Sequence, residues 1–277
     1  MRVLRLFLLL TGLLVTGITS AQGAPQSPIN LPLTIPIDPL LPVPVFNYPV
    51  EPLPVGVKVK NEGSPHRQTA LKADLATSTA KVTLGAVDYI LQNVHFHKRS
   101  EHYLNGNHFP MEMHLVHTSA AGANLAVGRW ITVGGADNPT LQEMFANLPA
   151  SGATRALTTV FNLHALKPTI ESSSRFHYDG SLTSPDPPFN PNPNDPPLAF
   201  TSTVDVKWIM YTEPLQMSLG QMNAFGALWN NDGNWRDLQP RTDLHNVRTN
   251  VPEPGTVWLL AVAGLVAGRS RRRADYY

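Results

Sequence analysis

Three histidines are spaced so that they could bind one metal ion. His95 and His97 are separated by one residue in Asn93-Val94-His95-Phe96-His97, a segment whose composition favours a β-strand. Side chains two positions apart on a strand project from the same face, so both imidazoles can reach the same ion. The third candidate is His114, in the strand-like segment 111–117. The sequence contains no cysteine, so any metal bound here has nitrogen and oxygen ligands.

A turn between the two segments would bring these histidines together. Asn105-Gly106 is a strong signal for a two-residue turn between strands. If this turn joins the strands directly, His97 lies opposite His114 and His95 lies diagonal to it, all on one face. Pro110 cannot donate a hydrogen bond within a sheet, so a hairpin with a bulge is the alternative to this register.

Three neutral imidazoles without a fourth protein ligand are typical of a catalytic zinc site. The open position holds a water molecule, whose pKa the ion lowers towards neutrality. Glu112 and Asn93 each precede a candidate ligand by two positions, so each could accept the second ring N–H of its histidine. The chain has 10 histidines, however, and one such pair is compatible with chance. The spacing alone therefore leaves open that these are buried or surface histidines without a metal.

The elements that must position these residues are mostly strands. Alternating hydrophobic patterns predict strands at 55–60, 81–84, 94–97, 111–117 and 204–211. Helical patterns occur at 140–148, after a turn at Asn138-Pro139, and at 220–228. Residues 184–197, SPDPPFNPNPNDPP, contain too much proline for a central strand and predict an exposed loop. We expect one mainly β (α+β) domain over residues 25–250, with a few short surface helices.

Both ends of the chain are typical of processing segments. Residues 1–24 begin with two arginines, continue with the apolar run 6–15 and end in small residues, as in a secretory signal peptide. Residues 251–277 contain Pro252-Glu253-Pro254, the apolar run 256–268 and four arginines. This tail resembles the PEP-CTERM sorting signal of Gram-negative bacteria. An ordinary membrane-anchoring tail is the alternative, although the apolar run is shorter than the ~20 residues of a spanning helix.

The PEP-CTERM resemblance implies export to the periplasm, cell surface or extracellular matrix, with transient inner-membrane anchoring through the tail. It also implies an exosortase-type processing enzyme and an exopolysaccharide matrix as partners. The formal net charge is only +1, from 21 basic and 20 acidic side chains, and gives no reason to expect nucleic acid.

Six segments, spread over residues 26–240, resemble the α-carbonic anhydrase family. They are QSPIN (26–30), HFH followed by SEH (95–102), MEMHLVH (111–117), YDGSLTSP (178–185), VKWI (206–209) and NWRDLQP (234–240). The family has a large, twisted, mostly antiparallel central sheet. The resemblance implies a zinc-dependent hydration of carbon dioxide to bicarbonate by zinc-bound hydroxide, with His95, His97 and His114 as ligands.

The resemblance also implies roles for other residues. Thr183 would accept a hydrogen bond from the hydroxide and donate its own proton to Glu101. The apolar pocket for carbon dioxide would be lined by Val116, Val127, Leu182, Ser184, Val206 and Trp208.

Four departures from the family pattern affect the activity that we expect. The N-terminal His-Trp-Gly-Tyr segment of the family is missing, and Ser64 stands where the family has its proton-shuttling histidine. His66, two residues further on, could replace that shuttle. Asn93 is shorter than the usual glutamine, and the proline-rich loop begins beside the pocket. We therefore expect an active but slow enzyme.

The sequence leaves two other functions open. The pattern His95-x-His97-x3-Glu101 also fits cupin metalloenzymes, in which the glutamate joins the histidines on iron or manganese. The second alternative is a catalytically silent cell-surface or matrix-binding module with the carbonic anhydrase fold.

Overall fold

The computed structural model describes residues 25–51, 53, 57–61, 71–76, 78–183, 202–228 and 233–252. Within these residues, eleven strands form one sheet and a separate pair, β1 (Asn30–Leu31) and β7 (Tyr103–Leu104), runs parallel. The strands of the large sheet are β2 (Val45–Asn47), β3 (Lys58–Asn61), β4 (Leu71–Asp74), β5 (Lys81–Leu84), β6 (Val87–Lys98), β8 (Met111–Ser119), β9 (Asn124–Val133), β10 (Thr154–Ala156), β11 (Arg175–Ser181), β12 (Asp205–Met217) and β13 (Arg248–Thr249).

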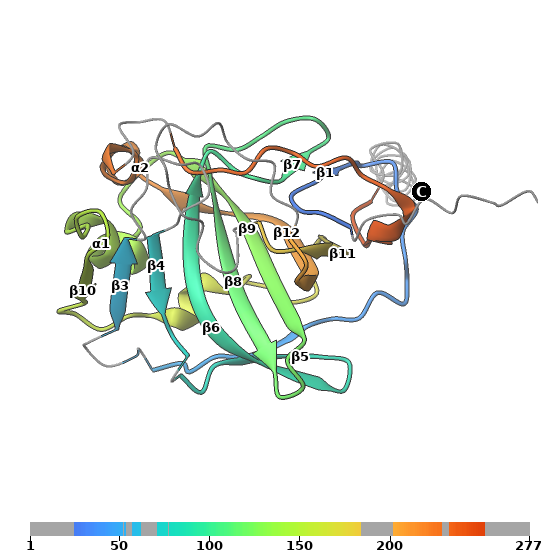
Figure 1. Cartoon of the computed structure of the whole chain (residues 1–277), viewed down its shortest axis with the longest axis horizontal. Coiled ribbons are helices and arrows are strands. Elements are labelled where there is room, and N and C mark those ends of the chain that lie inside the picture. The colour runs from blue at the N-terminus through green and yellow to red at the C-terminus, as the bar shows by residue number, and fades with distance from the viewer. Residues whose placement is uncertain are drawn as a thin grey trace, which may run out of the picture.

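The large sheet is mixed but mostly antiparallel. Its order is β10-β3-β4-β6-β8-β9-β12-β11-β13, and β5 pairs both with β6 and with β2 (Figure 1). Of its described strand pairs, only β9 and β12 are parallel. This architecture confirms the predicted fold class. The predicted strands also occur, although β3 begins only at Lys58 and β12 extends to Met217.

Two short α-helices lie beside each other, near β3 and β10 (Figure 1). In α1 (Pro139–Ala146) the side chain of Asn138 accepts a hydrogen bond from Thr140 N, and proline occupies the first turn. In α2 (Leu219–Ala227) Ser218 and Gln221 form a capping box. Both predicted helices are present, but α1 ends two residues before the predicted boundary. The 3-10 helices are η1 (Leu163–Leu166) and η2 (Asp243–His245).

The β6–β8 connection corrects the predicted hairpin register. Asn105 and Gly106 do form a two-residue turn, with φ values of 49° and 84°, but it joins Leu104 to Asn107. The arm leading to that turn carries two more residues than the returning arm, because Ser100 and Phe109 are already hydrogen-bonded to each other. His95 is therefore opposite His114, and His97 is opposite Glu112. The extra residues lie within 101–103 and bring Glu101 and His102 towards the histidines.

The register divides the sheet into two faces. One, here called the site face, carries His114, its partner Gly128 and, next across the sheet, Met210. The other, the back face, carries Leu115, its partner Val127 and, next across the sheet, Ile209. Each face packs against its own buried apolar cluster. A Cβ atom on Gly128 would clash with Met210 Sδ, so the Met210 side chain occupies the space that the glycine leaves on the site face.

Candidate metal centre

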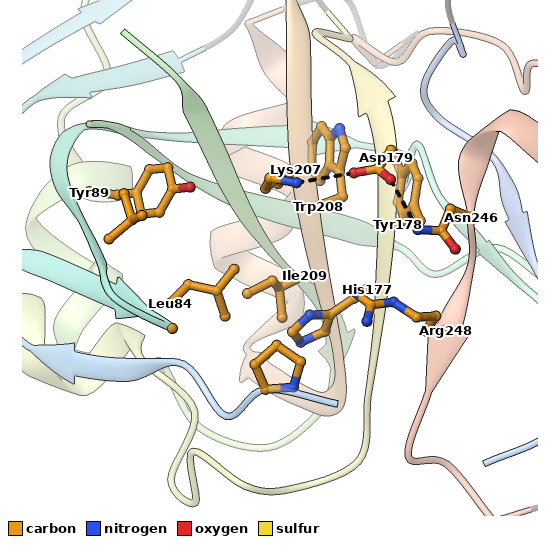
Figure 2. A pocket seen from close by; sticks show the side chains of 13 residues that line it. Leu84, Tyr89, His177, Tyr178, Asp179, Lys207, Trp208, Ile209, Asn246 and Arg248 are labelled. Carbon is orange, nitrogen blue, oxygen red and sulfur yellow. Dashed lines mark hydrogen bonds and ion pairs between the residues drawn. The ribbon is translucent and has the colours of Figure 1, made fainter. Parts of the chain in front are cut away.

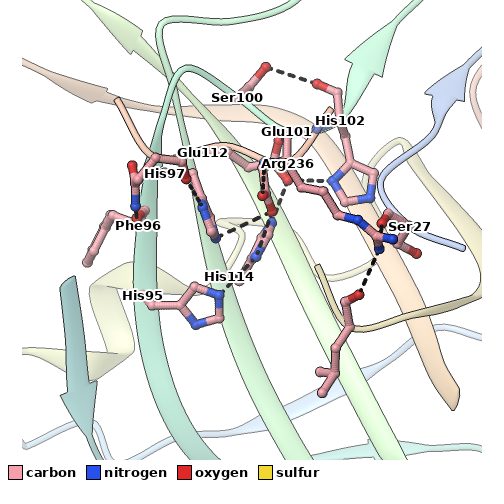
Figure 3. A network of polar contacts seen from close by, with 12 residues as sticks. Ser27, His95, Phe96, His97, Ser100, Glu101, His102, Glu112, His114 and Arg236 are labelled. Carbon is pink, nitrogen blue, oxygen red and sulfur yellow. Dashed lines mark hydrogen bonds and ion pairs between the residues drawn. The ribbon is translucent and has the colours of Figure 1, made fainter. Parts of the chain in front are cut away.

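The three histidines predicted to bind a metal converge on the site face. His95 and His97 come from β6 and His114 from β8, and all three are buried (Figure 3). The ring centroids are 5.1 Å apart for His95 and His97, 5.0 Å for His95 and His114, and 4.7 Å for His97 and His114. One ring nitrogen from each lies within 4.8 Å of the other two. The structure thus brings all three predicted ligands together, although the register that places them differs from the predicted one.

Hydrogen bonds to the outer ring nitrogens determine which nitrogen of each histidine faces the centre. His95 Nδ1 lies 2.8 Å from Asn93 Oδ1, and His97 Nδ1 lies 2.7 Å from the backbone oxygen of Asn234. His114 uses the opposite nitrogen, because its Nε2 lies 2.6 Å from Glu112 Oε1. Each acceptor requires a proton on its partner nitrogen, so lone pairs remain on His95 Nε2, His97 Nε2 and His114 Nδ1.

Burial keeps two of the imidazoles neutral. It lowers the pKa of His95 well below its usual value, and the neighbouring rings of His114 and His97 lower it further. Burial also lowers the pKa of His97, although Glu101 opposes this effect. Neutral imidazole is the form that binds a metal ion. At neutral pH these two rings therefore present lone pairs rather than protons to the centre.

Two buried atoms at the centre have no hydrogen-bond partner among the described residues. They are His97 Nε2 and Glu101 Oε2, which lie 3.4 Å apart. Leaving a buried polar group unpaired costs about 1–3 kcal/mol, so native structures rarely tolerate it without a reason. A cation held by the three lone pairs would satisfy His97 Nε2 directly. The donor set of three nitrogens without a thiolate therefore fits a metal ion with an open position.

Glu112 belongs to a longer chain of buried hydrogen bonds. Its carboxylate also lies 2.5 Å from His102 Nδ1 and 2.9 Å from His102 N. His102 Nε2 in turn lies 2.5 Å from the hydroxyl of Tyr178, which contacts Ser27 Oγ at 2.9 Å. Burial opposes ionisation of Glu112, but the bonds to His102 and His114 outweigh it and hold its pKa well below the usual range. The carboxylate is therefore ionised and accepts hydrogen bonds from both histidines.

Glu101 is held on the other side of the cluster. Its Oε1 accepts a hydrogen bond from Arg236 N at 2.7 Å, and the Arg236 guanidinium donates to the backbone oxygens of Ser27 and Leu182 (Figure 3). Thr183 follows Leu182 and is only 3% exposed. Within the described residues no hydrogen bond joins Thr183 to Glu101, so the predicted pair remains a prediction.

The apolar wall beside the cluster comes from the site face. The Trp208 ring lies 4.8 Å from that of His114, and Val206 is the neighbouring site-face position on β12. Val116 shares the face of His114 on β8, and Leu182 packs against the same apolar cluster as Trp208. The prediction for Val127 is wrong, because Val127 pairs with Leu115 and packs on the back face.

Ala126 occupies the site-face position that we had assigned to Val127. It pairs with Val116 on one side and with Trp208 on the other. A shift of one residue along a strand exchanges the two faces, and the sequence run Leu-Ala-Val does not reveal which residue faces inward. His66 and Ser184, also assigned to the site, lie outside the described residues, as do residues 184–201.

Sequence reasoning missed the roles of several buried polar residues. His102, Tyr178, Ser27, Asn234 and Arg236 lie within the segments that carry the family resemblance, but their contacts join residues far apart in sequence. Their presence in those segments was the only available signal.

Comparisons with known proteins identify the family of the chain. A family profile described as eukaryotic-type carbonic anhydrase matches residues 16–252. The chain belongs to this carbonic anhydrase family. Carbonic anhydrase from Klebsiella pneumoniae is 33% identical over 229 residues, which cover 80% of this chain and 79% of the relative. Membership of this family excludes the cupin alternative.

Solved structures show the carbonic anhydrase fold as well. Photobacterium profundum α-carbonic anhydrase aligns with a TM-score of 0.64 and 27% identity, covering 83% of this chain and 90% of that structure. A dioscorin complexed with ascorbate aligns with a TM-score of 0.63 and 26% identity, covering 82% and 86% of the two chains. The same fold therefore also occurs in a protein that is not named a carbonic anhydrase. The fold alone does not establish the activity, which has to be argued from the residues of the site.

A second profile, the PEP-CTERM protein-sorting motif, matches residues 250–273. This match confirms the resemblance seen in the tail and indicates export and surface sorting. In the part of the chain that the structure describes, no helix is long and apolar enough to cross a membrane. The apolar run 256–268 lies outside that part.

Proposed function

We propose that the protein is an exported zinc-dependent carbonic anhydrase (carbonate dehydratase), which converts carbon dioxide and water reversibly into bicarbonate and a proton. The observation that carries this proposal is the convergence of three histidine lone pairs beside an apolar wall. Zinc accepts three nitrogen ligands in a tetrahedral arrangement and leaves one position for water. When bound, zinc would make this water acidic enough to supply a nucleophile near neutral pH.

The residues around the cluster would hold and orient the reactants. His95, His97 and His114 would bind the ion, and Asn93 and Glu112 would keep two of them in the required tautomer. Carbon dioxide has no charge, so the wall formed by Trp208 and its neighbours would hold it without competing for its oxygens.

Thr183 and Glu101 would orient the nucleophile. A carboxylate can only accept hydrogen bonds, so a Thr183 hydroxyl directed at Glu101 Oε2 would donate a hydrogen bond there. Thr183 would then accept a hydrogen bond from the nucleophile and fix the direction of its lone pair. The unpaired, buried Glu101 Oε2 supports this arrangement. His66 would transfer the released proton to solvent.

A silent binding module is the second candidate. The dioscorin structure favours it, because a related fold is described there as a complex with ascorbate. We infer export to the periplasm, cell surface or extracellular matrix, with an exosortase-type enzyme and an exopolysaccharide matrix as partners. The PEP-CTERM match supports this location.

The deciding experiment measures carbon dioxide hydration by stopped flow and zinc content on one purified sample. We expect about one zinc per chain and activity above buffer, both lost in His114→Ala. His108→Ala is the matched control, since His108 is exposed and outside the cluster. Stoichiometric zinc without activity would instead favour the silent module, and a folded protein without zinc would refute the metal centre.

A further inference from the structure

A cavity lies on the back face of the sheet, away from the histidine cluster. It measures about 270 Å³ and lies between strands β11 and β12, the β5–β6 turn and the segment around Pro42 (Figure 2). His177 of β11 pairs with Ile209 of β12, and Ile209 pairs with Val127, which identifies the back face. Of the residues that line the cavity, only Trp208 also belongs to the apolar wall proposed for carbon dioxide.

His177 offers a hydrogen-bond donor to this cavity. Arg175 Nε donates a hydrogen bond to His177 Nε2 at 3.2 Å. The accepting nitrogen carries no proton, so the neutral ring has its proton on Nδ1. Burial, followed by the charges of Arg175, Arg248 and Lys207, lowers the pKa of His177 to about 3 and keeps the ring neutral. Nδ1 has no hydrogen-bond partner among the described residues and is not one of the fully buried unpaired atoms.

The charged groups around His177 leave an excess of positive charge. Arg248 pairs loosely with Asp38 at 3.6 Å, and Lys207 pairs with Asp179 at 3.5 Å. The guanidinium of Arg175 is buried, and among the described residues it bonds only to His177 and to backbone oxygens, with no carboxylate partner. Three cations therefore stand against two carboxylates, and a single negative charge would balance them.

The rest of the lining is mostly apolar, although Tyr89, Asp179, Lys207 and Asn246 also contribute to it. Leu84, Val87, Ile209 and Pro42 line it beside the polar end formed by His177 and Arg248 (Figure 2). The volume is slightly below the roughly 300 Å³ at which pockets for drug-sized ligands begin. An inorganic anion would leave most of this apolar surface in contact with water, whereas a small acid with a hydrocarbon body would cover it.

We propose that this back-face cavity binds a small organic monocarboxylate. The carboxylate accepts hydrogen bonds from His177 Nδ1 and from the Arg248 guanidinium, and the apolar body packs against Leu84 and Ile209. Such charge-assisted bonds are the stronger ones in proteins, and a guanidinium fits a carboxylate well. The site is independent of the metal centre and of the proposed enzymatic activity.

Benzoate is a suitable probe, because it combines one carboxylate with an apolar ring of the right size. The experiment titrates benzoate into the full-length zinc protein and follows the ring signals of the histidines by NMR. We expect the His177 signals to shift saturably, with affinity reduced about tenfold in Arg248→Gln. Arg241→Gln, an exposed arginine away from the cavity, is the control and should bind as the parent does.

A carboxylate can also bind a metal, so a second titration uses His114→Ala, which lacks a ligand of the metal centre. Unchanged benzoate affinity in this variant supports the back-face site. Binding that disappears in His114→Ala but persists in Arg248→Gln would overturn the proposal, as would the absence of any saturable shift of His177. None of these outcomes depends on whether the protein hydrates carbon dioxide.

Discussion

Glu112 Oε1 accepts the Nε2 proton of His114 at 2.6 Å, and the same carboxylate accepts two further hydrogen bonds from His102. This relationship explains why His114 presents Nδ1 to the cluster while the two histidines of β6 present Nε2. A carboxylate that is ionised and held in place by the hydrogen bonds from His102 keeps the imidazole of His114 in one tautomer and increases its basicity. The acceptor thus becomes part of the metal centre without touching the ion.

Glu112→Gln should weaken zinc binding by about 10- to 100-fold, because the neutral amide removes the charge that orients His114. Competition with a chromogenic chelator measures this change. Glu171→Gln, at a partly exposed surface pair with Lys167, should leave zinc affinity unchanged. Equal zinc affinity in the parent and Glu112→Gln would mean that the carboxylate does not support the ligand.

Thr183→Ala should lower kcat about 100-fold while zinc content stays at one per chain, since the substitution removes an orienting hydroxyl and no metal ligand. Thr183→Ser retains the hydroxyl and should recover most of the activity. The measurement is stopped-flow hydration with metal analysis of each sample. If serine and alanine variants were equally slow, the role of the hydroxyl would be refuted.

Ala126 and Val127 distinguish the two faces of β9. Ala126→Val adds two methyl groups beside Trp208 and should lower kcat/KM about tenfold through loss of substrate space. Val127→Ala removes volume from the back-face core and should lower the free energy of unfolding by about 2 kcal/mol with kcat/KM nearly unchanged. Kinetics and urea unfolding of both variants provide the test. If Ala126→Val mainly lowered the free energy of unfolding and Val127→Ala mainly lowered kcat/KM, Val127 rather than Ala126 would face the metal centre.

His117 should make the metal-free protein less stable in acid. Burial lowers the pKa of this imidazole to about 4, and its Nε2 lies 2.7 Å from the Tyr48 hydroxyl. The unfolded chain takes up this proton as the pH falls through about 6.5, whereas the folded protein does so only near 4. His117 therefore contributes stability above pH 6.5 that is lost as the pH falls to 4, roughly 3 kcal/mol in all.

Urea unfolding of metal-free samples at several pH values measures this slope. His117→Gln should flatten it between pH 6.5 and 4, because glutamine does not titrate. His108→Gln, at an exposed position, should keep the slope of the parent. A parent and a His117→Gln variant with parallel pH profiles would contradict the burial effect.

The fold class and the three histidines could be predicted because their signals are local. An alternating pattern identifies a strand, and residues two apart on a strand share a face whatever surrounds them. Glu112 and Asn93 could be found for the same reason, since each lies two positions before its histidine. The short Asn93 still reaches His95 Nδ1 at 2.8 Å, so its departure from the family's glutamine does not remove the contact.

The register of β6 against β8 could not be predicted in this way. A two-residue turn at Asn105-Gly106 fixes only the residues next to it, and the two extra residues before the turn shift every pair beyond. Val127 and Ala126 illustrate the same limit. Both are apolar and adjacent, and only the partner strands decide which of them faces the metal centre.

The sequence by itself determined that this chain carries a mainly β carbonic anhydrase domain with three histidines on one face and a sorting signal in its tail. Only the tertiary structure decided which ring nitrogen each histidine turns inward, which apolar residues form the wall and where Glu101, His102 and Arg236 act. The physical reason is distance along the chain. Strand periodicity depends on neighbouring residues. The hydrogen bonds from His97 to Asn234 and from Arg236 to Glu101, in contrast, form only when the sheet has brought remote segments together.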